Sequence, residues 1–216
     1  MQESDRNADP RTPNHERVFR ALRARVMHGV MEPGEPLTLR GIASEFGVSM
    51  TPAREAARRL VAEGALMLSA SGRIATPVLT NDRIEELAAL RALLEPELAS
   101  RALPRAHVVL MDRMADINTQ IGQVLTKGDA ISYVRLNLEF HRTLYLRAQA
   151  PAMLAMLETV WLQLGPSMRT LYAAERRATV LASHGKILQA LRSEDEPGLR
   201  VAVRADVTGG LRMLST

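Results

Sequence analysis

Asn137 and His141 form the pair whose spacing first suggests chemistry, because residues four apart in a helix share one face. Imidazole and oxygen ligands together suit zinc, nickel or manganese without selecting among them. A histidine on an apolar helix can instead be a hydrogen-bonded core residue, and both interpretations stay open. Three further histidines have no partner at a useful spacing: His15, His28 and His107. The chain contains no cysteine, which excludes disulfides, thiolate catalysis and Cys-ligated zinc.

A second pair, Arg54 and Arg58, lies one helical turn apart within residues 37–68, which predict two short helices joined by a tight turn. The first helix has one apolar face at i, i+3, i+4 and i+7, made of Leu39, Ile42, Ala43 and Phe46. Gly47 ends it, and Ser49 or Thr51 caps the next helix. That second helix turns Ala53, Ala57, Leu60 and Val61 inward, so Arg54 and Arg58 face outward.

After Gly64 the pattern changes from helix to strand. Leu66 to Leu68 form a short apolar run, residues 70–72 predict a turn, and residues 73–76 predict a returning strand. A basic-tipped hairpin after an arginine-lined helix indicates a winged helix-turn-helix, whose second helix enters the major groove of DNA. The alternative is an ordinary helical hairpin with solvated arginines. Since the net charge is only +4, any DNA footprint must be local.

The 216 residues can hold two small domains. We expect a disordered arm at 1–14, a winged domain at 15–76, a linker at 77–81 and a helical domain at 82–216. Asp82 with Glu85 predicts a capping box at the start of the helical domain. Its helices fall at 82–103, 105–127, 129–149, 151–172, 175–193 and 195–213. The predicted fold is mainly α: an N-terminal winged helix-turn-helix with a small β-hairpin wing, followed by an all-α six-helix bundle.

The segment PGEPLTLRGIASEFGVSMTPAREAARRLVAEGAL resembles the winged helix of GntR-family bacterial transcription regulators. The resemblance implies operator-DNA contacts from the recognition helix, the preceding helix and the wing. The residues at these places are Arg40, Ser49, Met50, Thr51, Arg54, Arg58, Gly72 and Arg73. Met50 stands where the family usually has an arginine, so a contact there would be apolar.

The helical half resembles the FCD effector domain of the FadR-type branch of that family. The matching residues are Leu90-Arg91-x-x-Leu94-Glu95, Asn137-x-x-Phe140-His141 and His184-x-x-Ile187-Leu188-x-Ala190-Leu191. Six helices, where the longer form has seven, point to the VanR-like subgroup. By resemblance Arg91 would face the effector cavity and bind a carboxylate. A salt bridge to Glu95, four residues later, is the alternative.

The resemblance also implies a divalent-metal site made of one aspartate and three histidines. Asn137 falls where the aspartate would be, His141 and His184 match two of the histidines, and Asp206 falls where the third would be. Two of the four positions therefore depart from the family pattern, although one carboxylate and three neutral ligands remain. Zinc, nickel or manganese could bind such a set.

These features predict a homodimeric transcriptional regulator, more often a repressor in this family, that binds an inverted repeat in double-stranded operator DNA and senses a small carboxylate metabolite. One alternative is a metal-dependent enzyme in the bundle with an accessory winged domain. Another is a helical adaptor that binds only protein. No apolar run reaches membrane length and residues 1–10 are unlike a signal peptide, so we expect a cytoplasmic protein with no membrane partner.

Overall fold

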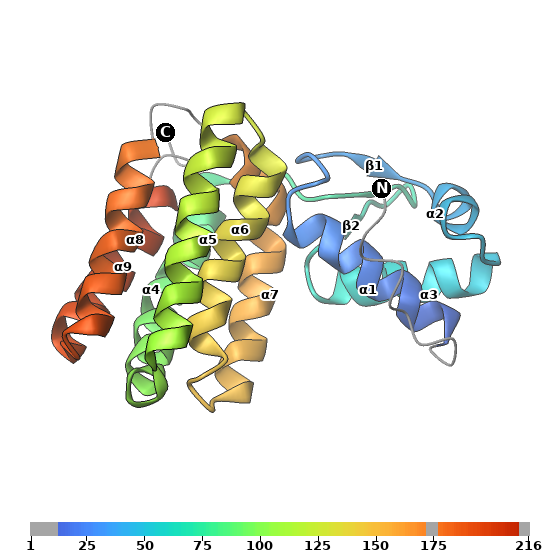
Figure 1. Ribbon diagram of the computed structural model, residues 1–216. Coiled ribbons are helices and arrows are strands. Elements are labelled where there is room, and N and C mark those ends of the chain that lie inside the picture. Colours follow the sequence, from blue (N-terminus) through green and yellow to red (C-terminus); the bar gives the residue numbers. More distant parts are fainter. Residues whose placement is uncertain (1–12, 172–176, 212–216) are drawn as a thin grey trace.

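The computed structural model describes residues 13–171 and 177–211, which form a small winged domain beside a helical bundle (Figure 1). The predicted mainly α fold is confirmed. Residues 1–12 of the predicted arm lie outside the described residues, and Asn14 already belongs to the first helix. Positions 172, 175–176 and 212–213 of the predicted helices also lie outside them.

The winged domain, residues 14–75, contains α1 (Asn14–Met27), α2 (Leu39–Phe46) and α3 (Met50–Ala62). Thr38 begins α2 because its hydroxyl accepts a hydrogen bond from the Gly41 amide at 2.9 Å. Gly47 ends α2 in the left-handed conformation, with φ 60°, which a glycine adopts without steric cost. The chain therefore reverses sharply before α3, as a helix-turn-helix requires.

The wing is part of a three-stranded antiparallel sheet and is therefore larger than the two-stranded hairpin that the sequence predicted. The strands are β1 (Pro36–Leu37), β2 (Met67–Leu68) and β3 (Ile74–Ala75), in the order β1-β3-β2. Thr76 fixes β1 beside β3, since its buried hydroxyl donates to the Glu32 carbonyl and accepts from the Glu35 amide at 2.9 Å.

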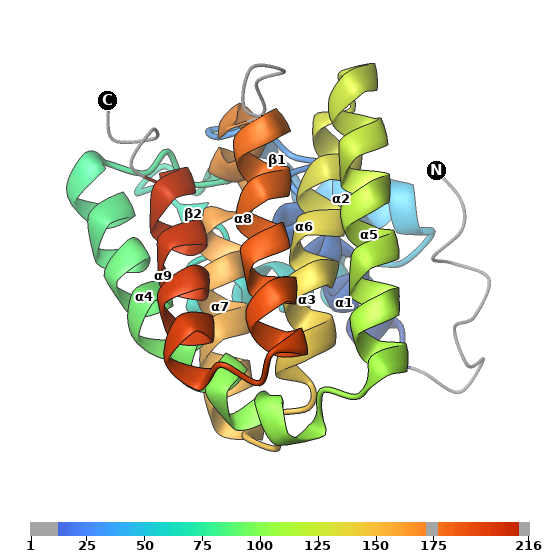
Figure 2. The same cartoon turned by 60° about the vertical axis from the view of Figure 1, so that its left-hand side comes forward.

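The bundle contains the six predicted helices, which lie side by side in Figure 2. They are α4 (Asn81–Ala102), α5 (Val108–Lys127), α6 (Ala130–Tyr145), α7 (Pro151–Met168), α8 (Arg177–Arg192) and α9 (Glu196–Leu211), with short 3-10 turns η1 (Leu103–Arg105) and η2 (Arg169–Leu171). The predicted capping box is wrong: Thr80 caps α4 by accepting from the Arg83 amide at 3.3 Å. Among the described helices, none is long and apolar enough to cross a membrane.

Helix α7 joins the two domains because it packs against α1 of the winged domain. Leu162 of α7 is fully buried in the hydrophobic core formed by the winged domain. Gly165, one turn away, lies against the α1 backbone so closely that a Cβ there would meet the Val26 carbonyl oxygen at 2.1 Å. The joint between the domains is thus a tight backbone contact with an apolar anchor.

We predict that Gly165→Ala destabilises the protein by about 1–3 kcal/mol, the usual cost of an overpacked contact, or detaches the winged domain from α7. Thermal and denaturant unfolding measure this. Gly185→Ala on α8 is the matched control, since nothing lies within 4 Å of its added Cβ and alanine favours a helix. Equal stability of the two variants would contradict the close contact.

Candidate functional site

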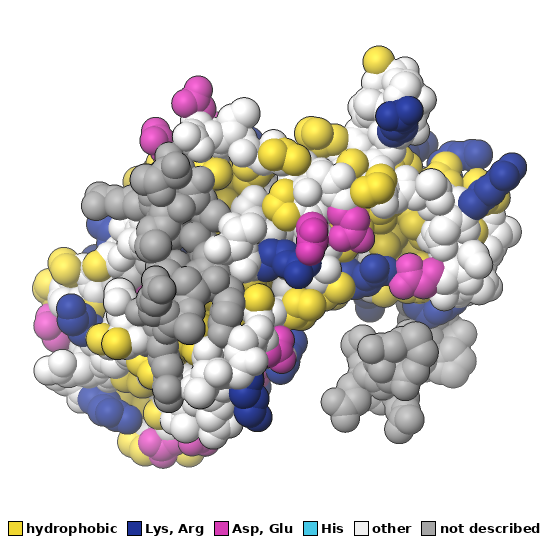
Figure 3. Space-filling view, turned by 90° about the horizontal axis from the view of Figure 1, so that it is seen from above, with side chains coloured by type: hydrophobic (Ala, Val, Ile, Leu, Met, Phe, Trp, Pro, Cys, Tyr) yellow, Lys and Arg dark blue, Asp and Glu magenta, His cyan; other side chains and the backbone are white. Residues whose placement is uncertain are grey.

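The second helix of the helix-turn-helix presents a polar face to solvent. In α3, Ala53, Ala57 and Leu60 are buried while Arg54 and Arg58 are exposed. All eight residues predicted to contact DNA are exposed: Arg40, Ser49, Met50, Thr51, Arg54, Arg58, Gly72 and Arg73. Lys and Arg side chains are visible at the end of the molecule that the winged domain forms, on the right of Figure 3. The prediction that these eight residues bind DNA stays a prediction.

The arginines of α3 differ in their surroundings. Arg59 is held by Glu16 at 2.7 Å and lies over the Phe19 ring, 3.5 Å from its centroid, so it packs α3 against α1. Within residues 13–171 and 177–211, Arg54 and Arg58 pair with no carboxylate. At the wing tip, the Arg73 amide donates to the Ser69 hydroxyl at 3.0 Å, which fixes the turn that exposes Arg73. The free guanidinium groups suit contacts with phosphates or guanine.

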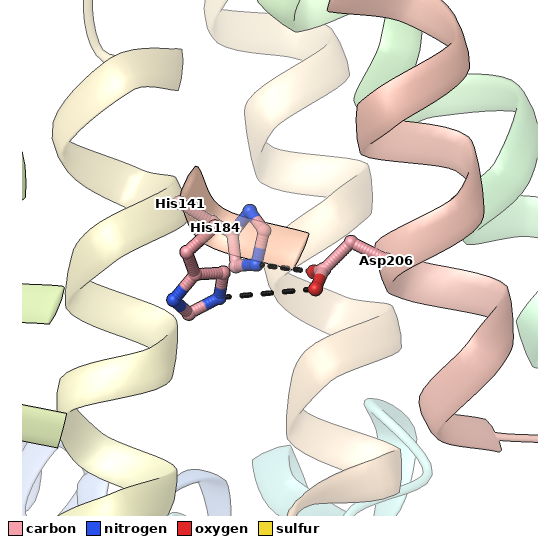
Figure 4. A group of neighbouring side chains, drawn as sticks. All are labelled: His141, His184 and Asp206. Atoms are coloured by element: carbon pink, nitrogen blue, oxygen red, sulfur yellow. Dashed lines mark ion pairs between the residues drawn. The ribbon is translucent and has the colours of Figure 1, made fainter. Parts of the chain in front are cut away.

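A second cluster lies inside the bundle, where His141 from α6, His184 from α8 and Asp206 from α9 point toward one another (Figure 4). His141 Nε2 lies 3.1 Å from Asp206 Oδ2, and His184 Nε2 lies 3.9 Å from Asp206 Oδ1. One ligand atom from each residue falls within 4.8 Å of the others. Both histidines are buried, so this is a compact group of metal-ligating types shielded from water.

Hydrogen bonds on the far side of each ring determine which nitrogen carries the proton. His184 Nδ1 lies 3.0 Å from the Asn118 Oδ1 atom, an oxygen that can only accept, so Nδ1 is the donor. His141 Nδ1 lies 3.2 Å from the Tyr145 hydroxyl, which already donates its hydrogen to Glu95 at 2.9 Å. Tyr145 must therefore accept from Nδ1 of His141. In the neutral form, each ring therefore turns an Nε2 lone pair toward Asp206.

These bare lone pairs fit a bound cation. Neither Nε2 atom has a hydrogen-bond partner within the described residues, although both are buried. Two lone pairs facing a carboxylate repel it unless a positive charge lies between them. A divalent ion would be held by the two nitrogens and the Asp206 carboxylate, and the outer partners Tyr145 and Asn118 are the kind that orient metal-binding histidines.

The pKa values of the cluster favour the ligating forms. Burial lowers the pKa of His184 to about 4, so its ring is neutral at pH 7. Burial alone would raise the pKa of Asp206, but a hydrogen bond from His141 in its protonated form and the positive charges of His184, His141 and Arg91 hold that pKa below its usual value, so Asp206 is a carboxylate. Burial and the charge of Glu95 raise the pKa of Tyr145 well above its ordinary value, so its hydroxyl keeps the proton that it donates.

Arg91 lies beside this cluster and is engaged with Glu95. The ion pair that the spacing of the two residues suggested is present, and both side chains are buried. Trp161 Nε1 also donates to Glu95, at 3.2 Å. The role of Arg91 in binding an effector stays a prediction, as does metal binding by Asn137, which is buried on α6 one turn before His141. Neither residue is among the three that converge.

Three residues around this site were missed by the sequence reasoning. Tyr145 stands four residues after His141 and could have been found by helical spacing. Asn118 lies on α5 beside His184, and Trp161 lies on α7 beside Glu95. No local pattern identifies these two, because packing of separate helices brings them to the neighbourhood of the site. Phe140, which the motif on α6 includes, stacks on His184 with ring centroids 4.0 Å apart.

A cleft of about 710 Å³ lies elsewhere, among the loops that follow α4, α6 and α8. Its lining includes Leu103, Arg105, His107, Leu146, Arg147, Leu191 and Glu194, and none of the three clustered residues. The cleft is therefore separate from the His141–His184–Asp206 site.

We predict that acid destabilises the metal-free protein through His184. Its pKa is about 4 when folded and near 6.5 when unfolded, so between these values the unfolded chain binds the extra proton. Stability is then complete above pH 6.5 and is lost as the pH falls toward 4, by about 2 kcal/mol at pH 5. Chemical unfolding at pH 7 and pH 5 in chelator measures this. His184→Gln should reduce the pH dependence, whereas His15→Gln on α1 should not.

The two halves of the chain match two family models. Residues 14–74 match the bacterial regulatory proteins of the gntR family, and residues 86–209 match the FCD domain. The first match spans the winged domain with its exposed arginines. The second spans the bundle that contains the His141–His184–Asp206 cluster.

Individual relatives agree with both matches. Over 182 residues the chain is 26% identical to the HTH-type transcriptional regulator McbR of Escherichia coli (strain K12), covering 83% of this chain and 82% of the relative. Over 189 residues it is 28% identical to the gluconate operon transcriptional repressor of Bacillus subtilis (strain 168), covering 83% and 76%. The solved structure of E. coli McbR/YncC has a TM-score of 0.86 at 25% identity, covering 94% of this chain and 97% of that one. The names of these relatives are those of transcriptional regulators. The chain therefore belongs to the gntR family of bacterial regulatory proteins, in the FadR-type branch that joins a DNA-binding winged helix-turn-helix to an FCD domain.

Proposed function

We propose that this protein is a homodimeric repressor whose winged domains bind an inverted repeat and whose bundle holds a divalent metal that helps a small carboxylate control DNA binding. The observation that supports the metal part is the pair of buried Nε2 atoms that face Asp206 without a hydrogen-bond partner within the described residues. The DNA part is supported by the exposed Arg54 and Arg58 of α3. Because operator DNA lies in the bacterial cytoplasm, we propose that the protein acts there.

In the metal site, His141, His184 and Asp206 would be the protein ligands. The metal would supply a positive centre to which a carboxylate can bind. The neutral amide of Asn137 is a weak metal ligand. We therefore expect Asn137 either not to contact the metal or to bind it through its amide oxygen. Tyr145 and Asn118 keep both imidazoles in the tautomer that ligates, and burial keeps His184 neutral.

The effector would be a carboxylate that reaches Arg91. Arg91 is buried and ion-paired with Glu95, so an incoming carboxylate competes with Glu95 for the guanidinium. The six-helix bundle favours the VanR-like subgroup. A ligand that binds one bundle arrangement more tightly than another shifts the placement of the two winged domains, and so changes operator affinity.

Two other functions make different predictions. A metal-dependent enzyme would turn over candidate carboxylates when loaded with zinc. A helical adaptor would bind no DNA. The exposed guanidinium groups on α3, together with the wing, favour the regulator over the adaptor, because an adaptor has no need of them.

The DNA part is tested by selecting duplexes from a random-sequence pool with the wild-type protein. We expect the recovered sites to be inverted repeats with half-sites about one helical turn, or about 34 Å, apart. Recovery of no preferred sequence would overturn the proposed function. A monomer in sedimentation that still binds one half-site tightly would overturn the dimer.

On a selected duplex, we predict that Arg54→Ala weakens binding at least tenfold, since a bidentate arginine–guanine pair is worth about 1–3 kcal/mol of discrimination. Fluorescence anisotropy measures the affinity, and circular dichroism checks that the fold is intact. Arg192→Ala, at an exposed position on α8, is the control and should bind normally. Met50→Arg should change the preferred sequence. Unchanged affinity and preference in Arg54→Ala would mean that α3 is oriented differently on DNA.

The metal part is tested with zinc chloride and Asp206→Asn. Wild type should bind zinc in calorimetry and melt at a higher temperature with zinc than in chelator. Asp206→Asn should lose at least tenfold in zinc affinity. In chelator it should melt no lower than wild type, because the new amide can donate a hydrogen to a bare Nε2.

Asp112→Asn on the exposed face of α5 is the control and should bind zinc as wild type does. The metal part would be refuted if purified untagged protein retained no divalent ion and neither zinc nor nickel changed its melting temperature or DNA affinity. The three residues would then be a polar lining of the bundle.

A further inference from the structure

Helix α7 contacts Glu95 and Tyr145, the neighbours of the histidine cluster, on one face and the winged domain on the next. Trp161 is buried and donates its indole N–H to Glu95. Leu162, the next residue, is fully buried in the winged-domain core. Because the two residues are neighbours on α7, a movement of the helix at Trp161 also moves Leu162, which anchors the winged domain.

The residues that follow hold the end of the recognition helix. Gln163 Nε2 donates to the carbonyl of Glu63 at 3.0 Å, and Glu63 is the C-cap of α3. Gln163 Oε1 accepts from Arg83 of α4 at 2.7 Å, so Gln163 is fixed from both sides. Arg169, just after α7, donates to the Val30 carbonyl at 3.3 Å. Helix α7 thus contacts α1, the turn after α1 and the end of α3.

Glu95 of α4 links α7 to the histidine cluster. It is fully buried, and its two carboxylate oxygens accept hydrogen bonds from different residues. Oε2 accepts from Tyr145, the residue that sets the tautomer of His141. Oε1 accepts from Trp161 of α7 and from Arg91. One carboxylate therefore links the ring orientation of His141 to the position of α7.

We propose that Glu95 is the positioning residue that transmits occupancy of the His141–His184–Asp206 site to α7 and through α7 to the recognition helix. If a bound cation draws His141 toward it, the Nδ1–H of His141 pulls on the Tyr145 oxygen. This pull alters the hydrogen bond that the Tyr145 hydroxyl donates to Glu95. The Glu95 carboxylate then moves, and its hydrogen bond from the Trp161 indole changes as well. Because the joint at Gly165 has no spare room, α7 and α1 move together. This inference rests on the proposed metal site.

Trp161 is the only tryptophan in the chain, so its fluorescence reports on this link without a label. Adding zinc chloride to the full-length wild-type protein should change Trp161 emission with the same midpoint as zinc binding in calorimetry. Tyr145→Phe should shift both midpoints to 10–100-fold higher zinc, the usual effect of removing the outer partner of a ligating histidine, and should reduce the emission change. Tyr133→Phe, a buried tyrosine elsewhere on α6, is the control.

Glu95→Gln tests the residue itself. The amide N–H₂ would face Tyr145 and donate to it, so Tyr145 would donate to His141 Nδ1 and the ring proton would move to Nε2. Zinc affinity should fall 10–100-fold although every ligand is present. Circular dichroism checks the fold, because this change also leaves Arg91 without its carboxylate.

Trp161→Phe separates transmission from binding, and it keeps the Arg91–Glu95 pair. Its zinc affinity by calorimetry should match wild type. In wild type, zinc should change affinity for the selected duplex by about 5–150-fold, the range typical of coupled sites. In Trp161→Phe that change should fall to less than twofold, while affinity for the duplex in chelator should equal that of wild type.

Three outcomes would overturn the inference. Zinc binding with no change in Trp161 emission would mean that Glu95 does not respond to the metal. A full zinc effect on DNA affinity in Trp161→Phe would mean that the signal takes another route, with the proposed function intact. Failure of wild type to bind zinc would remove the metal site and this inference together.

Discussion

Two buried imidazole Nε2 atoms facing one carboxylate are the constraint on which the interior of this protein depends. Nothing donates to Nε2 of His141 or His184 within the described residues, since Tyr145 and Asn118 take the protons on the other side. Burial raises the cost of this arrangement, because a buried polar atom without a hydrogen-bond partner has lost its hydrogen bonds to water. A cation bound by His141, His184 and Asp206 would remove the repulsion between the Nε2 lone pairs and the carboxylate.

The same constraint explains why the polar residues around the cluster form one connected set. Glu95 must accept from Tyr145 so that Tyr145 accepts from His141, and Arg91 balances the charge that Glu95 brings into the core. Trp161 completes the set and lies on the helix that also anchors the winged domain through Leu162. The proposed metal site and the winged domain are therefore connected through packed and hydrogen-bonded groups over a short path.

Much of the fold could be predicted from the sequence because its signals are local. The helix-turn-helix follows from apolar spacing in α2 and α3 and from Gly47, whose left-handed φ of 60° needs a glycine. Strand β1 was missed because two residues carry no periodic pattern, and its place depends on Thr76, some forty residues away. Thr80 rather than Asp82 caps α4, a choice between neighbours that composition alone does not decide.

The candidate site was harder to predict for the same reason. The spacing of Asn137 and His141 shows only that they share a helical face, and resemblance to the family added His184 and Asp206. The groups that set the tautomers, Tyr145 and Asn118, were outside both arguments, because Asn118 reaches His184 from another helix. Long-range packing, not local pattern, determines which nitrogen of each ring is free.

The most direct test of this account is a measurement of the imidazole tautomers by nitrogen NMR. With ¹⁵N-labelled histidine and no metal at pH 7, the account predicts that both His141 and His184 carry hydrogen on Nδ1 and none on Nε2. Zinc should then shift the Nε2 resonances of these two rings and leave that of His107 in place. Hydrogen on Nε2 of either buried ring, or resonances that do not respond to zinc, would contradict it.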